Sequence, residues 1–182
     1  MLIGQDGWLD GARRVPTTWF DRRPENEAVS LIVIHYISLP PNSFGGGYID
    51  KLFTGTLDPN EHPYFKRLYG FKCSSHFFID RFGRITQYVS CNDRAWHAGR
   101  SSWHGHKECN DYSVGIELEG CSWCAYTHEQ YESLIPLIRA LQSRYPGIGQ
   151  NLAGHSDVAP GRKSDPGPWF DWERVRAALS GI

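Results

Sequence analysis

Runs and alternations of apolar residues along the chain predict several β-strands. Leu31–Ile34 is an unbroken run of branched aliphatic residues that ends at His35, which is typical of a central strand buried on both faces. Two further strand candidates, Ser75–Asp80 and Arg84–Val89, flank a short segment that contains Gly83. This spacing predicts a β-hairpin with glycine in the turn.

The segment Ser113–Glu119 has a different pattern, because every second residue from Val114 to Leu118 is apolar. In a strand these residues share one face, and Glu117 and Glu119 share the other. Antiparallel sheets often keep one face in water. The pattern therefore predicts a half-buried strand whose two carboxylates point the same way.

Helical periodicity appears in the second half of the chain. Thr127–Gln130 has the spacing of a capping box, and the apolar residues after it recur every three or four positions: Tyr131, Leu134, Ile135, Ile138 and Leu141. Asn151–Gly154 is a short strand candidate, and Asp171–Leu179 is typical of a C-terminal helix. The whole pattern predicts a single mixed α/β domain over residues 1–182.

Composition narrows the class of protein. The chain has 182 residues, 40% apolar and 21% charged, with a formal net charge of -1. Such a balance gives no electrostatic reason to expect a nucleic acid or an anionic membrane as partner. The first residues resemble no secretory leader, and no run approaches the roughly 18 apolar residues of a membrane helix. Five cysteines, an odd number, favour reduced thiols, so we expect a soluble, unexported protein.

Candidate metal ligands stand at His35, at His155 and at Asp165 within the segment Gly161–Pro168. Two histidines and a carboxylate form a zinc triad that leaves one coordination position for water, as in hydrolases. Pro166 biases Asp165 toward an extended backbone, which lowers the entropy lost when a metal fixes its carboxylate. These residues predict a metal-dependent hydrolase.

Two more residues fit hydrolytic chemistry. Lys163 and Asp165 are two positions apart and can project to the same side of an extended segment. The Lys163 ammonium group would then stabilise an oxyanion beside the metal. Zinc polarises a carbonyl group and lowers the pKa of water, and Glu117 would accept the proton of that water and pass it to the leaving amine.

Each of these residues also has an ordinary interpretation. A histidine that closes an apolar strand is usually a hydrogen-bonded core residue, and Glu117 taken alone would face solvent.

Two other motifs could bind a metal. Cys121–Cys124 has the spacing of half a zinc ribbon or of a redox pair, but no second such pair exists, which favours a structural or incidental role. His104–His106 is expected to be a solvated loop.

Several sequence blocks resemble the zinc amidases, a family that includes peptidoglycan-recognition proteins and phage amidases. Within it they most resemble the bacterial cytoplasmic amidases that act on 1,6-anhydro-N-acetylmuramoyl-L-alanine. The resemblance spans nearly the whole chain, and its motifs are specific in order and spacing. The blocks are Leu31–His35, Ile37–Pro41, Phe53–Asn60, His62–Phe65, Arg94–Gly99, Cys109–Asp111, Gly115–Gly120 and Asp165–Pro168.

This resemblance implies a central mixed β-sheet flanked by helices. It also implies one Zn²⁺ per chain held by His35, His155 and Asp165, with Glu117 as general base and Lys163 as the partner of the scissile carbonyl. The implied reaction is hydrolysis of the lactyl–L-alanine amide of soluble anhydromuropeptides during cytoplasmic cell-wall recycling, with an influence on β-lactamase induction. We expect a monomer without a nucleic acid or membrane partner.

Substrate contacts are expected from Tyr36, Lys72, Trp96 and His97, although packing against the sheet is an equally good interpretation of Trp96. Three positions depart from the pattern of the cytoplasmic amidases. Tyr36 stands where asparagine is usual, Lys72 replaces an arginine, and Glu108 occupies a site where some relatives carry arginine. Lysine cannot reproduce a bidentate guanidinium contact, so these departures bear on substrate affinity and peptide preference and not on the zinc chemistry.

Two other functions compete with this hypothesis. A peptidoglycan-binding module without catalysis would share the fold, but such modules typically lose a zinc ligand. In this chain the predicted ligands and catalytic residues are all present: His35, His155, Asp165, Glu117 and Lys163. A secreted or phage amidase would attack intact wall and often carries a leader or a wall-binding domain. Cleavage of polymeric sacculi but not of soluble anhydromuropeptides would favour that alternative.

Overall fold

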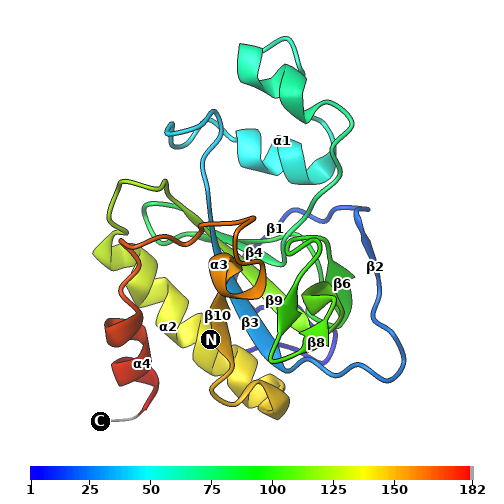
Figure 1. Cartoon of the computed structure of the whole chain (residues 1–182), viewed down its shortest axis with the longest axis vertical. Helices are drawn as coiled ribbons and strands as arrows, with labels where there is room; N and C mark the ends of the chain where they lie inside the picture. Colours follow the sequence, from blue (N-terminus) through cyan, green and yellow to red (C-terminus); the bar gives the residue numbers. More distant parts are fainter. Residues whose placement is uncertain (181–182) are drawn as a thin grey trace.

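A six-stranded mixed sheet forms the centre of the computed structural model, which describes residues 1–180 (Figure 1). The strand order is β1-β5-β4-β9-β3-β10, and only β4 and β5 pair antiparallel. The bounds are β1 (Arg13–Arg14), β3 (Leu31–Ile37), β4 (Phe77–Ile79), β5 (Ile85–Gln87), β9 (Ser113–Glu119) and β10 (Leu152–Gly154). The mixed α/β class and the β4–β5 hairpin are thus confirmed, with shorter hairpin strands than predicted.

Strands β3 and β9 lie in the middle of this sheet. Leu31–His35 is buried, as predicted for a central strand. The prediction of a half-buried β9 is wrong, because all seven of its residues are buried. β9 pairs in parallel with β4 and β3, and packed layers cover both faces of the sheet there, as is usual for parallel strands.

Helices α2 (His128–Arg144) and α4 (Trp172–Leu179) cover one face of the sheet. Thr127 begins α2 with the predicted capping box, since its hydroxyl accepts from the Gln130 N–H and the Gln130 amide oxygen accepts from the Thr127 N–H. The apolar side of α2 packs on alternate strand residues. This core includes Ile32, Ile34, Val114, Ile116, Leu118, Leu134, Leu137, Ile138, Leu141 and Val175.

The opposite face carries the shorter elements. They are α1 (Tyr48–Thr54), η1 (Pro63–Leu68), η2 (Cys109–Asp111), α3 (His155–Val158) and the ribbons β2–β6 (Phe20–Arg22, Asp93–Ala95) and β7–β8 (Ser102–Trp103, His106–Lys107). The short η3 (Pro146–Ile148) instead follows α2, and its Ile148 joins the core on the α2 side. Figure 1 shows α1 and η1 standing away from the helix α2, beyond one edge of the central layer. A second apolar cluster joins α1 to β4 and the segment after β5 through Leu52, Phe53, Phe78 and Tyr88.

The remaining motifs of the sequence differ in burial. Cys121 is buried and Cys124 half-buried, both as free thiols, and His104 and His106 are exposed on the β7–β8 ribbon. Trp172 packs on Phe170 next to the core, whereas Trp169 is 54% exposed. Within residues 1–180, no helix combines the length and apolar character that crossing a membrane requires.

Candidate metal centre and catalytic cleft

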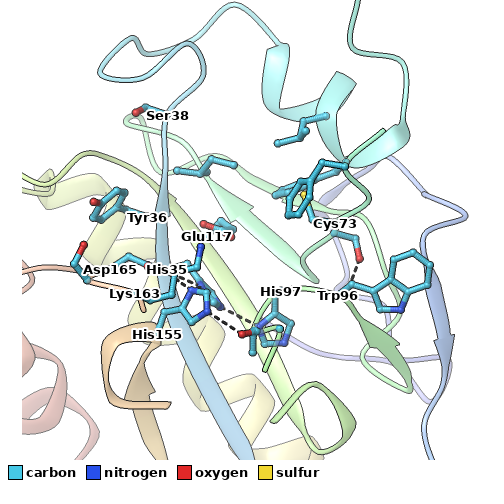
Figure 2. A pocket seen from close by; sticks show the side chains of 18 of the residues that line it. His35, Tyr36, Ser38, Cys73, Trp96, His97, Glu117, His155, Lys163 and Asp165 are labelled. Carbon is cyan, nitrogen blue, oxygen red and sulfur yellow. Dashed lines mark hydrogen bonds and ion pairs between the residues drawn. The ribbon is translucent and has the colours of Figure 1, made fainter. Parts of the chain in front are cut away.

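A cleft of about 670 Å³ opens on the sheet face opposite α2. That volume falls within the roughly 300–1,000 Å³ of small-molecule sites. Every residue predicted for the site lines this cleft: His35, Tyr36, Lys72, Trp96, His97, Glu117, His155, Lys163 and Asp165. Figure 2 shows the two metal-ligand histidines, Asp165, Lys163 and Glu117 gathered at one end, with Trp96 at the other.

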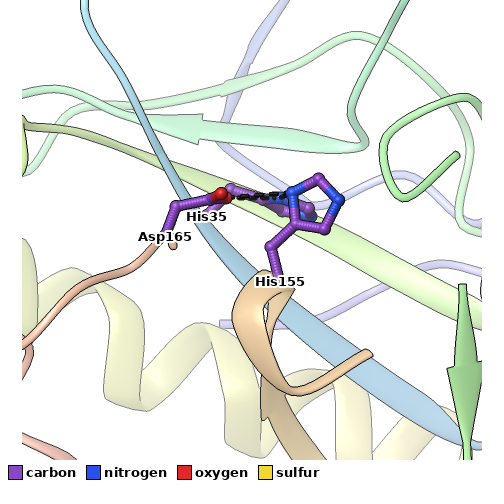
Figure 3. A group of neighbouring side chains, drawn as sticks. All are labelled: His35, His155 and Asp165. Atoms are coloured by element: carbon purple, nitrogen blue, oxygen red, sulfur yellow. Dashed lines mark hydrogen bonds and ion pairs between the residues drawn. The ribbon is translucent and has the colours of Figure 1, made fainter. Parts of the chain in front are cut away.

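Three donor atoms converge at that end. The Nδ1 atoms of His35 and His155 lie 2.9 Å apart, and Oδ2 of Asp165 lies 3.0 Å from each of them. All three side chains are buried, and they come from β3, from the first residue of α3 and from the loop after α3 (Figure 3). Within residues 1–180 this is the one cluster of three or more such side chains that could hold a metal ion.

The topology explains this convergence. Gly154 pairs with Ile34 in the parallel β10–β3 ladder, so His155 leaves β10 beside His35. The ligand loop is held at two points. The Ser156 N–H donates to the Asp165 carbonyl at 2.9 Å, and the buried Tyr126 hydroxyl donates to the Pro166 carbonyl at 2.7 Å.

The electrostatics of the three groups favour a cation between them. The Ala98 carbonyl, 3.0 Å from Nε2 of His155, can only accept, so that nitrogen carries the proton and Nδ1 presents a lone pair. Burial lowers the pKa of His35 to about 4. Burial alone would raise the pKa of Asp165, but its close contacts with the His155 and His35 rings outweigh burial and lower that pKa. The Asp165 carboxylate therefore supplies negative charge to the cluster, and burial keeps the His35 ring uncharged near neutral pH.

Zinc fits this donor set. Its bonds to histidine nitrogen and carboxylate oxygen are about 2.0–2.1 Å, so a tetrahedral arrangement places neighbouring donor atoms roughly 3.3 Å apart. The observed separations of 2.9 and 3.0 Å are slightly smaller. Small side-chain rotations would admit the ion.

Glu117 is the buried acid next to this cluster. It is 8% exposed, and its Oε2 has no hydrogen-bond partner among the described residues. Burial and the charge of Asp165 raise its pKa well above the usual value, while the Lys163 ammonium group lowers it. An unpaired carboxyl with a raised pKa at the wall of a cleft is typical of a proton-transfer group.

The four expected substrate contacts have different surroundings. Tyr36 is half-buried and Lys72 is exposed. The Trp96 indole N–H donates to Asp21 at 2.6 Å, which orients the half-buried ring at the cleft. Both ring nitrogens of the buried His97 contact protein groups, His35 and Ser113. Glu108 is exposed and lies outside the lining of the cleft.

Sequence reasoning missed several residues of the lining, among them Tyr64, Phe71, Cys73 and Arg162. Burial raises the pKa of the Cys73 thiol to about 12. Because Arg162 directly precedes Lys163, its place in the cleft could have been predicted from the sequence. Its guanidinium donates to the carbonyls of Ala98 and Arg100 at 2.5 and 2.8 Å. Tyr64, Phe71 and Cys73 stand in no chemical motif, and only the fold brings them to the cleft.

The mixed sheet, the buried ligand cluster and the adjacent acid together define a hydrolase of mixed α/β architecture. The family model described as N-acetylmuramoyl-L-alanine amidase matches residues 25–168. The chain belongs to this family and is an N-acetylmuramoyl-L-alanine amidase.

Similar proteins agree with this assignment. The chain is 54% identical over 179 residues to the 1,6-anhydro-N-acetylmuramyl-L-alanine amidase AmpD of Citrobacter freundii, covering 98% of this chain and 96% of that protein. A crystal structure of a selenomethionine derivative of AmpD superposes with a TM-score of 0.95 at 54% identity, covering 98% and 99% of the two chains. The amidase AmiD of E. coli, solved with anhydro-N-acetylmuramic acid-L-Ala-D-γ-Glu-L-Lys, has a TM-score of 0.62 at 29% identity, over 87% of this chain and 61% of AmiD.

Proposed function

We propose that this protein hydrolyses the amide bond between the lactyl group and L-alanine in soluble 1,6-anhydro-N-acetylmuramoyl peptides, with one zinc ion per chain. The observation that carries the proposal is the approach of His35, His155 and Asp165 to within 3.0 Å of one another beside the unpaired carboxyl of Glu117. The name of the C. freundii relative and the ligand of the AmiD structure support the choice of substrate.

His35, His155 and Asp165 would hold the zinc ion through Nδ1, Nδ1 and Oδ2. When bound, zinc would polarise the scissile carbonyl and make water a better nucleophile. Glu117 accepts the proton from the attacking water, and its raised pKa suits it to hand that proton to the leaving L-alanine amine. The Lys163 ammonium group, which lines the same end of the cleft (Figure 2), would stabilise the negative charge that develops on the carbonyl oxygen.

The remainder of the cleft would bind the two ends of the substrate. The Trp96 ring offers an apolar face to the sugar or the peptide, with its orientation set by Asp21. The exposed ammonium group of Lys72 is suited to a carboxylate of the stem peptide. Tyr36 adds an aromatic wall on the β3 side.

The biological setting follows from this substrate. We infer that the whole chain acts as one amidase domain, as a cytoplasmic monomer in cell-wall recycling, without a nucleic acid or membrane partner. Removal of anhydromuropeptides would also influence β-lactamase induction where these compounds are the inducing signal. Size-exclusion chromatography with light scattering tests the oligomeric state.

The proposal is tested by mass spectrometry of the purified protein incubated with soluble anhydromuropeptides, with and without a chelator. We expect release of the intact stem peptide and the anhydro sugar, inhibition by the chelator and recovery with Zn²⁺. Asp165→Ala is the matched control, and it should show no turnover and weaker zinc binding. Activity that survives removal of all metal would contradict the metal role.

Two competing functions give different results in the same experiment. A peptidoglycan-binding module would bind the muropeptide without releasing a product. An amidase of the intact wall would release peptides from polymeric sacculi and leave soluble anhydromuropeptides unchanged.

A further inference from the structure

Both histidine ligands direct their outer ring nitrogens to consecutive residues of one segment. Nε2 of His35 lies 2.9 Å from Nδ1 of His97, and Nε2 of His155 lies 3.0 Å from the Ala98 carbonyl oxygen. The position of this short segment therefore determines which way both ligand rings face.

The side-chain amide of the buried residue Asn110 holds this segment in place. Oδ1 of Asn110 accepts the backbone N–H of His97 at 3.2 Å and that of Ala98 at 2.8 Å, and Asn110 is 5% exposed. Arg162 also donates to the Ala98 carbonyl. These contacts join η2 and the ligand loop to the same two residues.

The His97 ring is fixed as firmly as its backbone. Nε2 of His97 lies 3.2 Å from Oγ of Ser113. On β9, a Cβ atom at Gly115 would come within 2.5 Å of Cγ of the His97 ring, so only glycine leaves space for the ring there. The ring is thus clamped between His35 and β9 and has no free nitrogen for substrate.

The direction of the hydrogen bonds follows from the ligand atom that His35 must present. A metal bound at Nδ1 requires a lone pair there, so Nε2 of His35 carries the proton. That N–H can donate only if Nδ1 of His97 is bare, which places the proton of His97 on Nε2, facing the Ser113 hydroxyl. The opposite direction would put a proton on Nδ1 of His35, inside the ligand cluster.

We propose that His97 is a positioning residue of the metal centre: it accepts the Nε2–H of His35, donates in turn to Ser113, and so holds the Nδ1 lone pair of His35 toward His155 and Asp165. This inference rests on the proposed metal function of the site. It assigns His97 a role different from the substrate contact that the sequence predicts. Outer partners of histidine ligands fix the tautomer and the ring orientation in metal sites generally.

The test compares His97→Asn with His97→Leu. Asparagine keeps an acceptor oxygen at the position of Nδ1, whereas leucine has a similar branched shape and no acceptor. In the full chain, His97→Leu should weaken zinc affinity, measured by competition with a chelator, by roughly 10–100-fold. His97→Asn should lose less than about tenfold, because the acceptor that His35 needs is retained.

A second readout does not depend on metal or on activity. Long-range ¹H–¹⁵N NMR of the metal-free full chain reports which nitrogen of His35 carries the proton. The wild type should hold more of the Nε2–H tautomer than His97→Leu, because the variant leaves only the Asp165 carboxylate, 3.0 Å from Nδ1, to accept a proton from the His35 ring. Ser113→Ala removes only the last acceptor and should shift the tautomer in the same direction, which keeps the test valid if His97→Leu does not fold.

The possible results separate the hypotheses. Unchanged zinc affinity and an unchanged His35 tautomer in His97→Leu would overturn this inference and leave the proposed function standing. A rise in KM alone would make His97 a substrate contact. Equal losses in the Asn and Leu variants would exclude the hydrogen bond as the cause. A wild type that binds no zinc would instead overturn the proposed function, and this inference with it.

Discussion

Glu117 lies directly opposite His35 in the parallel ladder between β9 and β3. Paired residues of neighbouring strands project from the same face of a sheet, so the acid and the first metal ligand enter the cleft together. The register of the two strands thus sets the distance between the proton acceptor and the metal centre.

Replacement of this acid separates catalysis from metal binding. We expect Glu117→Gln to bind zinc normally and to lower kcat by about 10²–10⁴-fold, because the amide cannot accept the proton of the attacking water. Its melting temperature should not fall, since a neutral group replaces a buried carboxyl with an unpaired oxygen. Steady-state kinetics with zinc titration tests this, and an unchanged kcat would reject the role of general base.

The two lysines of the cleft should differ in kinetic effect. Lys163→Met is expected to reduce kcat by about 100–1,000-fold, as when one donor to an oxyanion is lost. Lys72→Met should mainly raise KM, because this residue is proposed to contact the peptide before and during reaction. Both side chains are exposed, so neither variant should change the melting temperature. Equal kcat losses in the two variants would refute the distinction.

The hydrogen bond behind the ligand loop should affect both stability and metal affinity. Tyr126→Phe leaves the buried Pro166 carbonyl unpaired, at a cost of about 1–3 kcal/mol, and frees the loop that carries Asp165. We expect a lower melting temperature and weaker zinc binding. Tyr131→Phe is the matched control, because its hydroxyl accepts the Asp171 N–H at the start of α4 instead. That variant should lose stability and retain zinc affinity.

Stability should decrease in mild acid because His76 is buried in its neutral form. Nδ1 of His76 accepts the Gly115 N–H, and burial together with Arg23 lowers its pKa to about 3. Between that value and about 6.5 the unfolded chain binds a proton that the folded chain does not. The free energy of unfolding therefore falls as pH decreases through this window, by up to about 1.4 kcal/mol per pH unit from this group.

Denaturant unfolding at several pH values, with a chelator present, checks this expectation. His76→Gln should reduce the slope between pH 5 and 6.5 by the share of this group, since the buried His35 and His97 keep theirs. His104→Gln, on an exposed turn, should leave the slope unchanged. Identical slopes in the wild type and His76→Gln would show that the proton is taken up elsewhere.

Local sequence patterns were sufficient to predict the elements that depend on neighbouring residues alone. The aliphatic run before His35 is stable only as a fully buried strand. The capping box at Thr127 specifies the start of α2, and the apolar residues that follow at intervals of three and four specify its buried side. The proline-rich segment around Asp165 likewise indicated the ligand loop, because proline restricts its own backbone and that of the preceding residue. In each case, neighbouring residues carry the whole physical preference.

The sequence by itself determined the class of chemistry, because only a few side chains bind zinc or transfer protons and their motifs stand in a specific order. Tertiary structure alone decided the burial of β9 and the position of Glu117 in the wall of the cleft. It also decided the engagement of His97 with His35 and the gathering of Cys73, Tyr64 and Arg162 around the cleft. These features depend on strand order, on register and on which layer covers each face. They arise from contacts between residues far apart in the chain, which no local pattern encodes.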